Sequence, residues 1–210
     1  MSIAEEATRK CIPLESGDRL TRAEFERRYS ARPDIKKAEL IEGVVYVASP
    51  VSTQEHGTPH VLLATWLGVY VSRIGGVVPA IDSTVRLDID NEVQPDLFLA
   101  WDASHGGAAR LVDGFLEGAP ELVVEIAASS ASHDMNAKMH VYRRNGLREY
   151  IAWQIYEERI DWFRLNADGV YESVEPGSDG CIASEVFPGL RLDVPALLRG
   201  DLAAVIAAVG

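Results

Sequence analysis

Two acidic residues interrupt apolar segments in which a folded chain normally tolerates no charge. Glu125 stands inside the run LVVEIA at 122–127, and Asp96 begins the run DLFLAW at 96–101. Both runs predict buried β-strands, and an ionised carboxylate in such a strand is costly unless it is paired, hydrogen-bonded or bound to a metal. The fold must therefore bring a compensating group to each of the two positions.

Two kinds of partner can compensate these carboxylates. If the two strands are neighbours in one sheet, Asp96 and Glu125 can converge on one hard cation, because Mg²⁺ prefers oxygen ligands and takes few of them from side chains. Such an ion can activate water and neutralise charge on a phosphodiester. Alternatively each carboxylate pairs with a nearby arginine, for which Arg86 and Arg148 are candidates. The two residues alone leave both alternatives open.

Further polar residues can join the same site. Glu42 precedes a strand and can act as a ligand or a water-orienting base, although an acid at such a position is more often a surface residue. Asp134, Lys138 and Tyr142 recur every four residues and share one face of the helix expected after the Glu125 strand. Lys138 can point its ammonium at the carboxylates, although a helical lysine four residues after an aspartate usually forms only an exposed ion pair.

Other catalytic signatures are missing from the sequence. His56 and His60 are four residues apart but lack the intervening glutamate of a zinc-binding HExxH motif, and His133 is most simply a turn residue. The chain contains no GxSxG, no P-loop and no GxGxxG after a strand, which argues against the corresponding hydrolases, nucleotide triphosphatases and dinucleotide-binding enzymes.

The remaining patterns predict a mixed α/β chain. They indicate helices at about 20–30, 60–72, 133–145 and 195–209, a hairpin or helix-to-strand turn at 38–47, strands at about 77–89 and 96–101, a loop or helix at 103–119, and an antiparallel meander at 148–175. Thr21 with Glu24 forms a capping-box pattern for the first helix. The second helix has two possible starts, Thr58-Pro59 and the earlier Ser52.

Composition sets the outer limits. The chain has 210 residues, 47% of them hydrophobic and 25% charged, which predicts one soluble domain over 1–210. Cys11 and Cys181 suggest neither a disulfide framework nor a zinc site, and the acidic N-terminus lacks an apolar signal region, so we expect a cytoplasmic protein without membrane insertion. A net charge of −12 disfavours tight, indiscriminate DNA binding, although a bound cation reverses the sign of the field at a carboxylate site.

Several landmarks in a fixed order resemble one bacterial family. They are ELIEGVVYVASP with Glu42, EHG with His56, QPDL with Gln94 and Asp96, PELVVEIA with Glu125, SHDMNAKMHVY with Asp134, Lys138 and Tyr142, and NGLREYIAWQIYEERIDWFRL. This set, spanning about 20–175, resembles the Uma-two family of predicted endonucleases with a restriction-endonuclease-like fold.

The resemblance implies a central mixed sheet flanked by helices, with Asp96 and Glu125 as the two acids of a PD-(D/E)xK signature. The position two after Glu125 is Ala127 instead of the signature's lysine. Similar sequences of the family place a lysine on the following helix, which here is Lys138. The resemblance thus implies an endonuclease that uses Mg²⁺ or Mn²⁺ on DNA, with the Ile126 carbonyl as a backbone ligand.

Two rival hypotheses remain from the sequence. The net charge and Ala127 favour a catalytically inactive nuclease fold that serves as a binding or assembly module. Alternatively the two acids form a glycosidase pair, which needs aromatic side chains around the cleft, and Trp101 and Trp153 are the candidates. Edge strands in the meander suggest a homodimer in either case.

Overall fold

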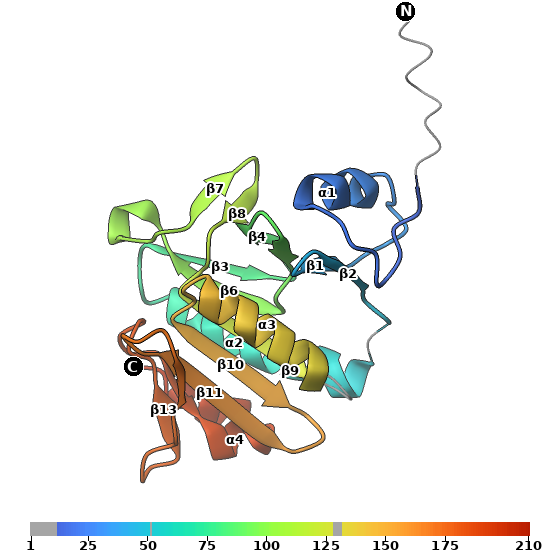
Figure 1. Cartoon of the computed structure of the whole chain (residues 1–210). Helices are drawn as coiled ribbons and strands as arrows, with labels where there is room; N and C mark the ends of the chain where they lie inside the picture. Colours follow the sequence, from blue (N-terminus) through green and yellow to red (C-terminus); the bar gives the residue numbers. More distant parts are fainter. Residues whose placement is uncertain (1–11, 51, 128–131) are drawn as a thin grey trace, which may run out of the picture.

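A computed structural model describes residues 12–50, 52–127 and 132–210, with the side chains of 132–135 left out of the description. Its strands form two six-stranded sheets and one small hairpin (Figure 1). The sheet that we call the central sheet has the order β12-β11-β10-β9-β6-β3. Its strands are β3 (Val77–Ile81), β6 (Leu97–Trp101), β9 (Leu122–Ala127), β10 (Glu149–Gln154), β11 (Arg159–Leu165) and β12 (Tyr171–Ser173).

The central sheet is mixed. β9 and β10 are parallel, and every other neighbouring pair in it is antiparallel. Parallel neighbours need a crossover connection, and the helix α3 (Ser132–Arg144) supplies it between β9 and β10. The antiparallel meander expected at 148–175 is present as β10, β11 and β12.

The second sheet has the order β2-β1-β5-β4-β8-β7. Its strands are β1 (Ala38–Ile41), β2 (Val44–Val47), β4 (Val85–Asp88), β5 (Asn91–Val93), β7 (Arg110–Val112) and β8 (Phe115–Glu117). The helix α1 (Arg22–Ser30) lies beside it, and Thr21 caps α1 by accepting a hydrogen bond from the Glu24 amide. The predicted hairpin at 38–47 is therefore confirmed as β1 and β2.

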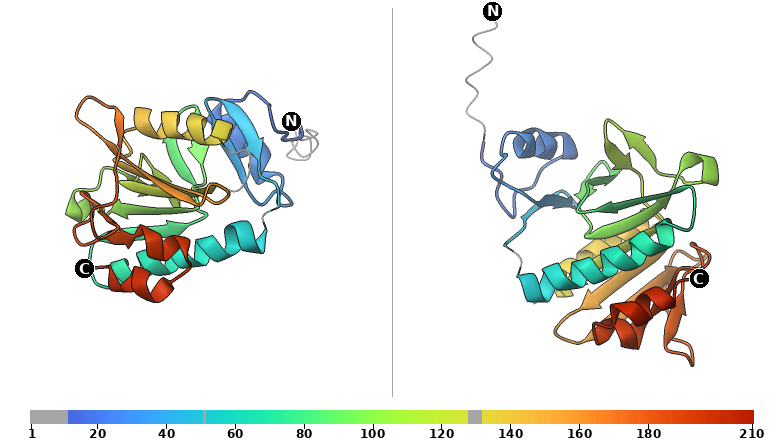
Figure 2. Two further views of the ribbon diagram at one scale, coloured as in Figure 1. Left: turned by 90° about the horizontal axis from the view of Figure 1, so that it is seen from below. Right: turned by 180° about the vertical axis from the view of Figure 1, so that it is seen from behind.

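Helices cover both faces of the central sheet (Figure 2). One face packs against α2 (Thr58–Val71), α4 (Val194–Leu198), α5 (Leu202–Ala207) and the hairpin β13 (Cys181–Ala183)–β14 (Arg191–Asp193). The other face packs against α3 and the second sheet. Alternate residues of β9 divide between the two cores: Leu122, Val124 and Ile126 face α2, while Val123 faces α3.

The structure corrects two predicted boundaries and decides a third that the sequence left open. The single strand expected at 77–89 is two strands in different sheets, because the chain turns at Asp82, whose φ is +45°. The C-terminal helix at 195–209 is two helices, interrupted at Gly200, whose φ is +72°. The helical segment before α2 begins early as the π-helix η2 (Thr53–Gly57), and Ser52 caps it by accepting a hydrogen bond from the Glu55 amide.

The segment 103–119 contains both a short helix and strands. The 3₁₀-helix η3 (Ala103–His105) is followed by the β7–β8 hairpin, whose strands complete one edge of the second sheet. Among the residues that the structure describes, no helix is both long and apolar enough to cross a membrane.

Candidate functional site

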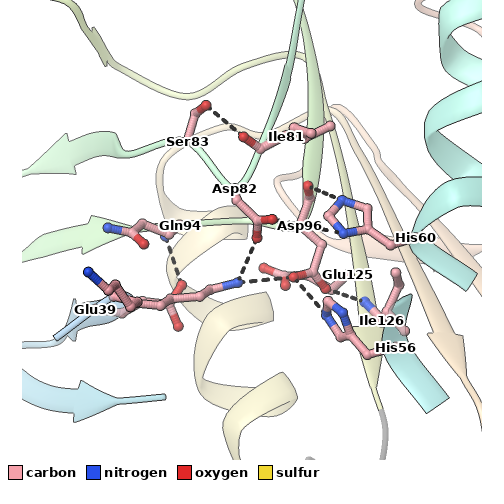
Figure 3. A network of polar contacts seen from close by, with 12 residues as sticks. Glu39, His56, His60, Ile81, Asp82, Ser83, Gln94, Asp96, Glu125 and Ile126 are labelled. Carbon is pink, nitrogen blue, oxygen red and sulfur yellow. Dashed lines mark hydrogen bonds and ion pairs between the residues drawn. The ribbon is translucent and has the colours of Figure 1, made fainter. Parts of the chain in front are cut away.

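Asp96 directly precedes β6, and Glu125 lies in the neighbouring antiparallel strand β9. The ladder between β6 and β9 pairs Leu97 with Val124, and the same register extended by one residue would set Asp96 opposite Glu125. Opposite residues of an antiparallel pair project from the same face of the sheet, with Cβ atoms about 4.5–5.5 Å apart. Figure 3 shows the two carboxyl groups side by side. Both side chains are buried, with 2% and 6% exposure.

Three donors surround the Asp96 carboxylate. Lys37 Nζ lies 3.0 Å and His56 Nε2 3.2 Å from Oδ1, and the Ile126 amide donates to Oδ2 at 2.8 Å. Burial alone raises the pKa of Asp96, but the hydrogen bond with His56 and the positive charge of Lys37 outweigh it and hold that pKa well below its usual range. Asp96 is therefore an anion at neutral pH.

The Glu125 carboxylate has a different environment on the α3 side of the sheet. Lys138 Nζ donates to its Oε1 at 3.1 Å and the Tyr142 hydroxyl donates to the same atom at 2.9 Å. Burial raises the pKa of Glu125 to about 7, since the negative charges of Asp96 and Glu39 offset part of the opposing effect of Lys138. The pKa of Asp96 is thus lowered, and the pKa of its neighbour Glu125 is raised, relative to their ordinary values.

A third acid reaches the cluster, and it is Glu39 of β1. Lys138 Nζ lies 2.9 Å from Glu39 Oε1, and the Gln94 amide donates to that same oxygen at 2.8 Å. We refer to Glu39, Asp96, Glu125 and Lys138 as the acidic cluster. The acidic cluster joins the two sheets. Glu39 belongs to β1 of the second sheet, Glu125 belongs to β9 of the central sheet, and Asp96 directly precedes β6 of the central sheet.

Glu42 does not reach the acidic cluster. It occupies the turn between β1 and β2 with a φ of +50°, is exposed, and pairs with Arg144 at 3.4 Å. The expectation that Glu42 faces the cleft is therefore corrected: the acid that does so stands three residues earlier, on the strand itself. A turn residue points away from the sheet face to which the alternate strand residues Lys37 and Glu39 project.

Glu39 and Lys37 are not among the site residues predicted from the sequence. Both belong to the segment KKAEL that leads into β1, and their spacing of two residues is the period by which a strand presents side chains on one face. That spacing was the available indication, but a short mixed-charge segment before a turn is usually solvated. The position of the second sheet against the central sheet, which buries Glu39, was not visible in the pattern.

The supporting residues divide into those that contact the cluster and those that do not. His56 contacts Asp96, and His60 Nε2 lies 3.1 Å from the Asp96 carbonyl oxygen. Gln94 contributes its main-chain amide, while its side chain donates to the Tyr29 hydroxyl at 3.2 Å. The side chain of Asp134 lies outside the described residues, as does that of His133.

Lysines, and not arginines, balance the two strand acids. Arg86 pairs instead with Glu26, Glu92 and Glu117 on the far side of the second sheet. Lys37 pairs with Asp96 and Lys138 pairs with Glu125, where the sequence had offered Arg86 and Arg148 as possible partners.

The aromatic residues required by the glycosidase alternative face elsewhere. Trp153 belongs to the core on the α2 face of the central sheet, the face opposite to the carboxylates. Trp101 stacks on Phe187 with ring centroids 5.0 Å apart. Neither ring is placed to hold a sugar beside the acid pair, so this alternative loses its candidates.

The oxygen atoms of the acidic cluster are of the chemical type that binds a hard divalent cation. Asp96 and Glu125 offer adjacent carboxylates, and oxygen ligands of this type suit Mg²⁺ and Mn²⁺. The Ile126 amide points to Asp96, and in a strand the amide and carbonyl of one residue point to the same side, so its carbonyl oxygen projects there too. Over the described ranges, no group of three or more His, Cys, Asp or Glu residues is arranged to hold a metal ion. The fit therefore rests on two carboxylates and a carbonyl, with water for the other positions.

Comparisons with known proteins agree with this architecture. A family model described as "Uma2: Putative restriction endonuclease" matches residues 22–195. A solved structure from Anabaena variabilis, described as "a putative nuclease belonging to DUF820", has a TM-score of 0.62 and 16% sequence identity, and the match covers 78% of this chain and 90% of that one. At this identity the likeness shows the fold, a mixed sheet flanked by helices as in restriction endonucleases. No curated protein matches the chain.

Proposed function

The chain belongs to the Uma2 family, and on that premise we propose that it is an endonuclease that hydrolyses DNA phosphodiester bonds with Mg²⁺ or Mn²⁺. The observation that carries the proposal is the pair of buried carboxylates of Asp96 and Glu125, side by side in Figure 3, with Lys138 between Glu125 and a third acid, Glu39. Such a concentration of buried charge is costly for stability alone, which favours a catalytic use.

Asp96 and Glu125, with the Ile126 carbonyl, are the residues that would hold the cation. A divalent cation at such a site supplies positive charge next to the phosphate and favours deprotonation of an attacking water. His56 and Lys37 keep Asp96 ionised and fix its orientation through Oδ1. Tyr142 restrains the Glu125 side chain by donating a hydrogen bond to its Oε1.

Lys138 is the residue to which we assign stabilisation of the transition-state charge. Its ammonium lies within hydrogen-bond distance of both Glu39 and Glu125, and its side chain is only 11% exposed. The chemistry needs a cation near the carboxylates, and Ala127 cannot provide one from the strand. A lysine one helical layer above the strand meets the same requirement from another direction.

Calorimetric titration with Mn²⁺ tests the metal site. Wild type, Asp96→Asn and Glu125→Gln are compared with Glu42→Gln, a matched control that removes an acid outside the cluster. Loss of binding in the first two variants with binding kept in the control supports the proposal. Equal binding in all four proteins removes the metal site.

A nicking assay separates the active from the inactive fold. Supercoiled DNA is incubated with Mn²⁺ at several salt concentrations, because electrostatic DNA binding weakens steeply with salt. Nicking by wild type that is lost in Lys138→Ala supports the endonuclease. The inactive binding module, favoured by the net charge of −12 and by Ala127, is supported instead if Mn²⁺ binds but no DNA is cut.

The finer expectations stay predictions. A homodimer, a cytoplasmic location, a single domain over 1–210 and the choice between Mg²⁺ and Mn²⁺ each require their own measurement.

A further inference from the structure

Two lysines lie among the carboxylates of the site, and they differ in exposure. The Lys138 side chain is 11% exposed, and its ammonium contacts Glu39 at 2.9 Å and Glu125 at 3.1 Å. The Lys37 side chain is 26% exposed, and its ammonium contacts Asp96 Oδ1 at 3.0 Å. Lys138 is therefore enclosed between two buried acids, whereas part of Lys37 reaches solvent.

The exposed side of the site lies at the turn between β3 and β4. Asp82 occupies this turn with its side chain 51% exposed, and Figure 3 shows that side chain pointing toward the carboxyl groups of Asp96 and Glu125. Lys37 lies between the two aspartates, 3.5 Å from Asp82 Oδ1 and 3.0 Å from Asp96 Oδ1. A ligand that enters from solvent beside Asp82 therefore meets Lys37 before it meets Lys138.

The Lys37 ammonium has hydrogen-bonding capacity to spare. An ammonium group has three N–H donors, and one of them is used at Asp96. The contact with Asp82, at 3.5 Å, is at the long limit of a hydrogen bond. Within the part of the chain that the structure describes, Lys37 has no third acceptor. One donor is therefore free, and a second is only weakly used.

A metal ion can bind Asp96 without displacing Lys37. Oδ1 receives both Lys37 and His56, whereas Oδ2 receives, among the described residues, only the Ile126 amide. A carboxylate has about four lone-pair positions, so one position on Oδ2 is available to the ion. Lys37 and the ion then share one carboxylate, and both can contact the same phosphate.

A phosphate that approaches this site needs positive charge from the protein. The net charge of the chain is −12, and DNA affinity depends on lysines and arginines that replace counterions. Hydrogen bonds from an ammonium to a phosphate are among the strong ones. Lys36 is adjacent in the sequence, but its ammonium contacts the Pro33 carbonyl oxygen at 3.0 Å instead of the site. Lys37 is thus the better placed of these two neighbours.

We propose that Lys37 binds the phosphate of the DNA at this site, with its ammonium donating to a non-bridging phosphate oxygen while it stays on Asp96. The phosphate takes the place of the long contact with Asp82. This inference rests on the proposed function. It adds a direct substrate contact to the part assigned to Lys138, which lies deeper among the acids.

Fluorescence anisotropy of a labelled short DNA duplex tests the contact. Binding is measured at several salt concentrations with Ca²⁺, which also prefers oxygen ligands, and a gel checks that the duplex stays intact. Lys37→Met should weaken binding about tenfold at low salt. It should also reduce the slope of log affinity against log salt by about 0.9, the value for one phosphate contact. Lys36→Met, which removes the same charge one residue away, should keep the wild-type slope, and Lys37→Arg should retain most of the affinity.

Calorimetry with Mn²⁺ separates a phosphate contact from a purely structural role. Lys37→Met removes a like charge beside the metal site, so it should bind Mn²⁺ at least about threefold more tightly than wild type. His56 and the Ile126 amide still hold Asp96 in this variant. The effects on Mn²⁺ and on DNA are therefore opposite in sign, whereas damage to the fold weakens both.

Asp82→Asn is the second variant. Asparagine tolerates the positive φ of 45° at this position, and the change removes the acid that competes with the phosphate for Lys37. It should strengthen DNA binding in the wild-type background by more than it does in Lys37→Met, because the competition requires the lysine.

The possible failures are distinguishable. Equal DNA affinity and salt slope for Lys37→Met and Lys36→Met overturn the inference, as does loss of both Mn²⁺ and DNA binding in Lys37→Met. If the wild type nicks DNA, either result leaves the proposed function standing. A wild type that neither binds Mn²⁺ nor nicks DNA removes the proposed function itself.

Discussion

Replacing Lys138 by methionine tests how much the ammonium group between Glu39 and Glu125 contributes to the stability of the fold. The ammonium contacts Glu39 at 2.9 Å and Glu125 at 3.1 Å, and all three side chains are about nine-tenths buried. Methionine keeps the length and apolar stem of the side chain but removes the charge and the hydrogen bonds. The two carboxylates then remain buried without their common cation.

The expected cost follows from this geometry. Removing one partner of a buried ion pair typically costs about 3–5 kcal/mol, because the remaining charge is uncompensated. For a domain of this size each kcal/mol changes the melting temperature by about 2–4 °C. We therefore expect Lys138→Met to lower the melting temperature by roughly 6–20 °C at pH 8.

The cost should depend on pH with a defined sign. The pKa of Glu125 in the folded chain is about 7, already above its ordinary value of 4.5, and loss of Lys138 raises it further. A carboxyl whose folded pKa is raised loses stability as pH rises between the unfolded and folded values. Lys138→Met should thus be closer to wild type at pH 5 than at pH 8.

Thermal unfolding of four proteins at both pH values gives the answer. They are wild type, Lys138→Met, the double variant Lys138→Met with Glu125→Gln, and Lys36→Met as the control for loss of an exposed lysine. The double variant should be more stable than Lys138→Met, since the neutral amide removes the uncompensated charge. The reasoning is refuted if Lys138→Met changes stability by less than about 1 kcal/mol at pH 8, as surface substitutions do.

Three other outcomes follow from the site and its surroundings. Glu39→Gln should reduce DNA nicking by at least about tenfold while Glu42→Gln leaves it unchanged, because only the first contacts the acidic cluster; nicking rates measure both. Mn²⁺ affinity should rise as pH increases from 5 to 8, with its midpoint near the pKa of Glu125 at about 7, and level off above about pH 8, where Glu125 is ionised; calorimetry at successive pH values measures this. Gly107→Ala should destabilise the fold by more than about 2 kcal/mol in chemical denaturation, because a Cβ there overlaps the Trp101 carbonyl oxygen.

The sequence was sufficient to predict the two central strands and the burial of their acids. A single acid in an otherwise apolar strand is a strong indication, because few folds keep such a residue without a specific partner. The period of two also set the orientation: once β6 and β9 are antiparallel neighbours, alternation places Asp96 and Glu125 on one face. The neighbour relationship itself was an assumption that only the structure could confirm.

The residues that reach the acidic cluster from the second sheet could not be predicted from the sequence pattern. Glu39 is buried because two sheets meet at β1, and no local periodicity of AELI reveals a contact with strands more than fifty residues away. Asp82 illustrates the same limit: its positive φ divides a continuous β-like segment between two sheets. Side chains that act across sheets, such as Lys37 on Asp96, depend on this tertiary arrangement.

Lys138 brings an ammonium to the Glu125 carboxylate from a helix, and the proposed function assigns it the part of the lysine that the signature places in the strand. A lysine at 127 would leave β9 on the same face as Glu125, since the two positions are two residues apart. α3 crosses that face, and its residues 138 and 142 are one turn apart, so both side chains point down at the Glu125 carboxylate. The helix thus delivers an ammonium and a phenol where the strand could deliver only the ammonium. The added tyrosine contact restrains Glu125 in a way that an in-strand lysine could not.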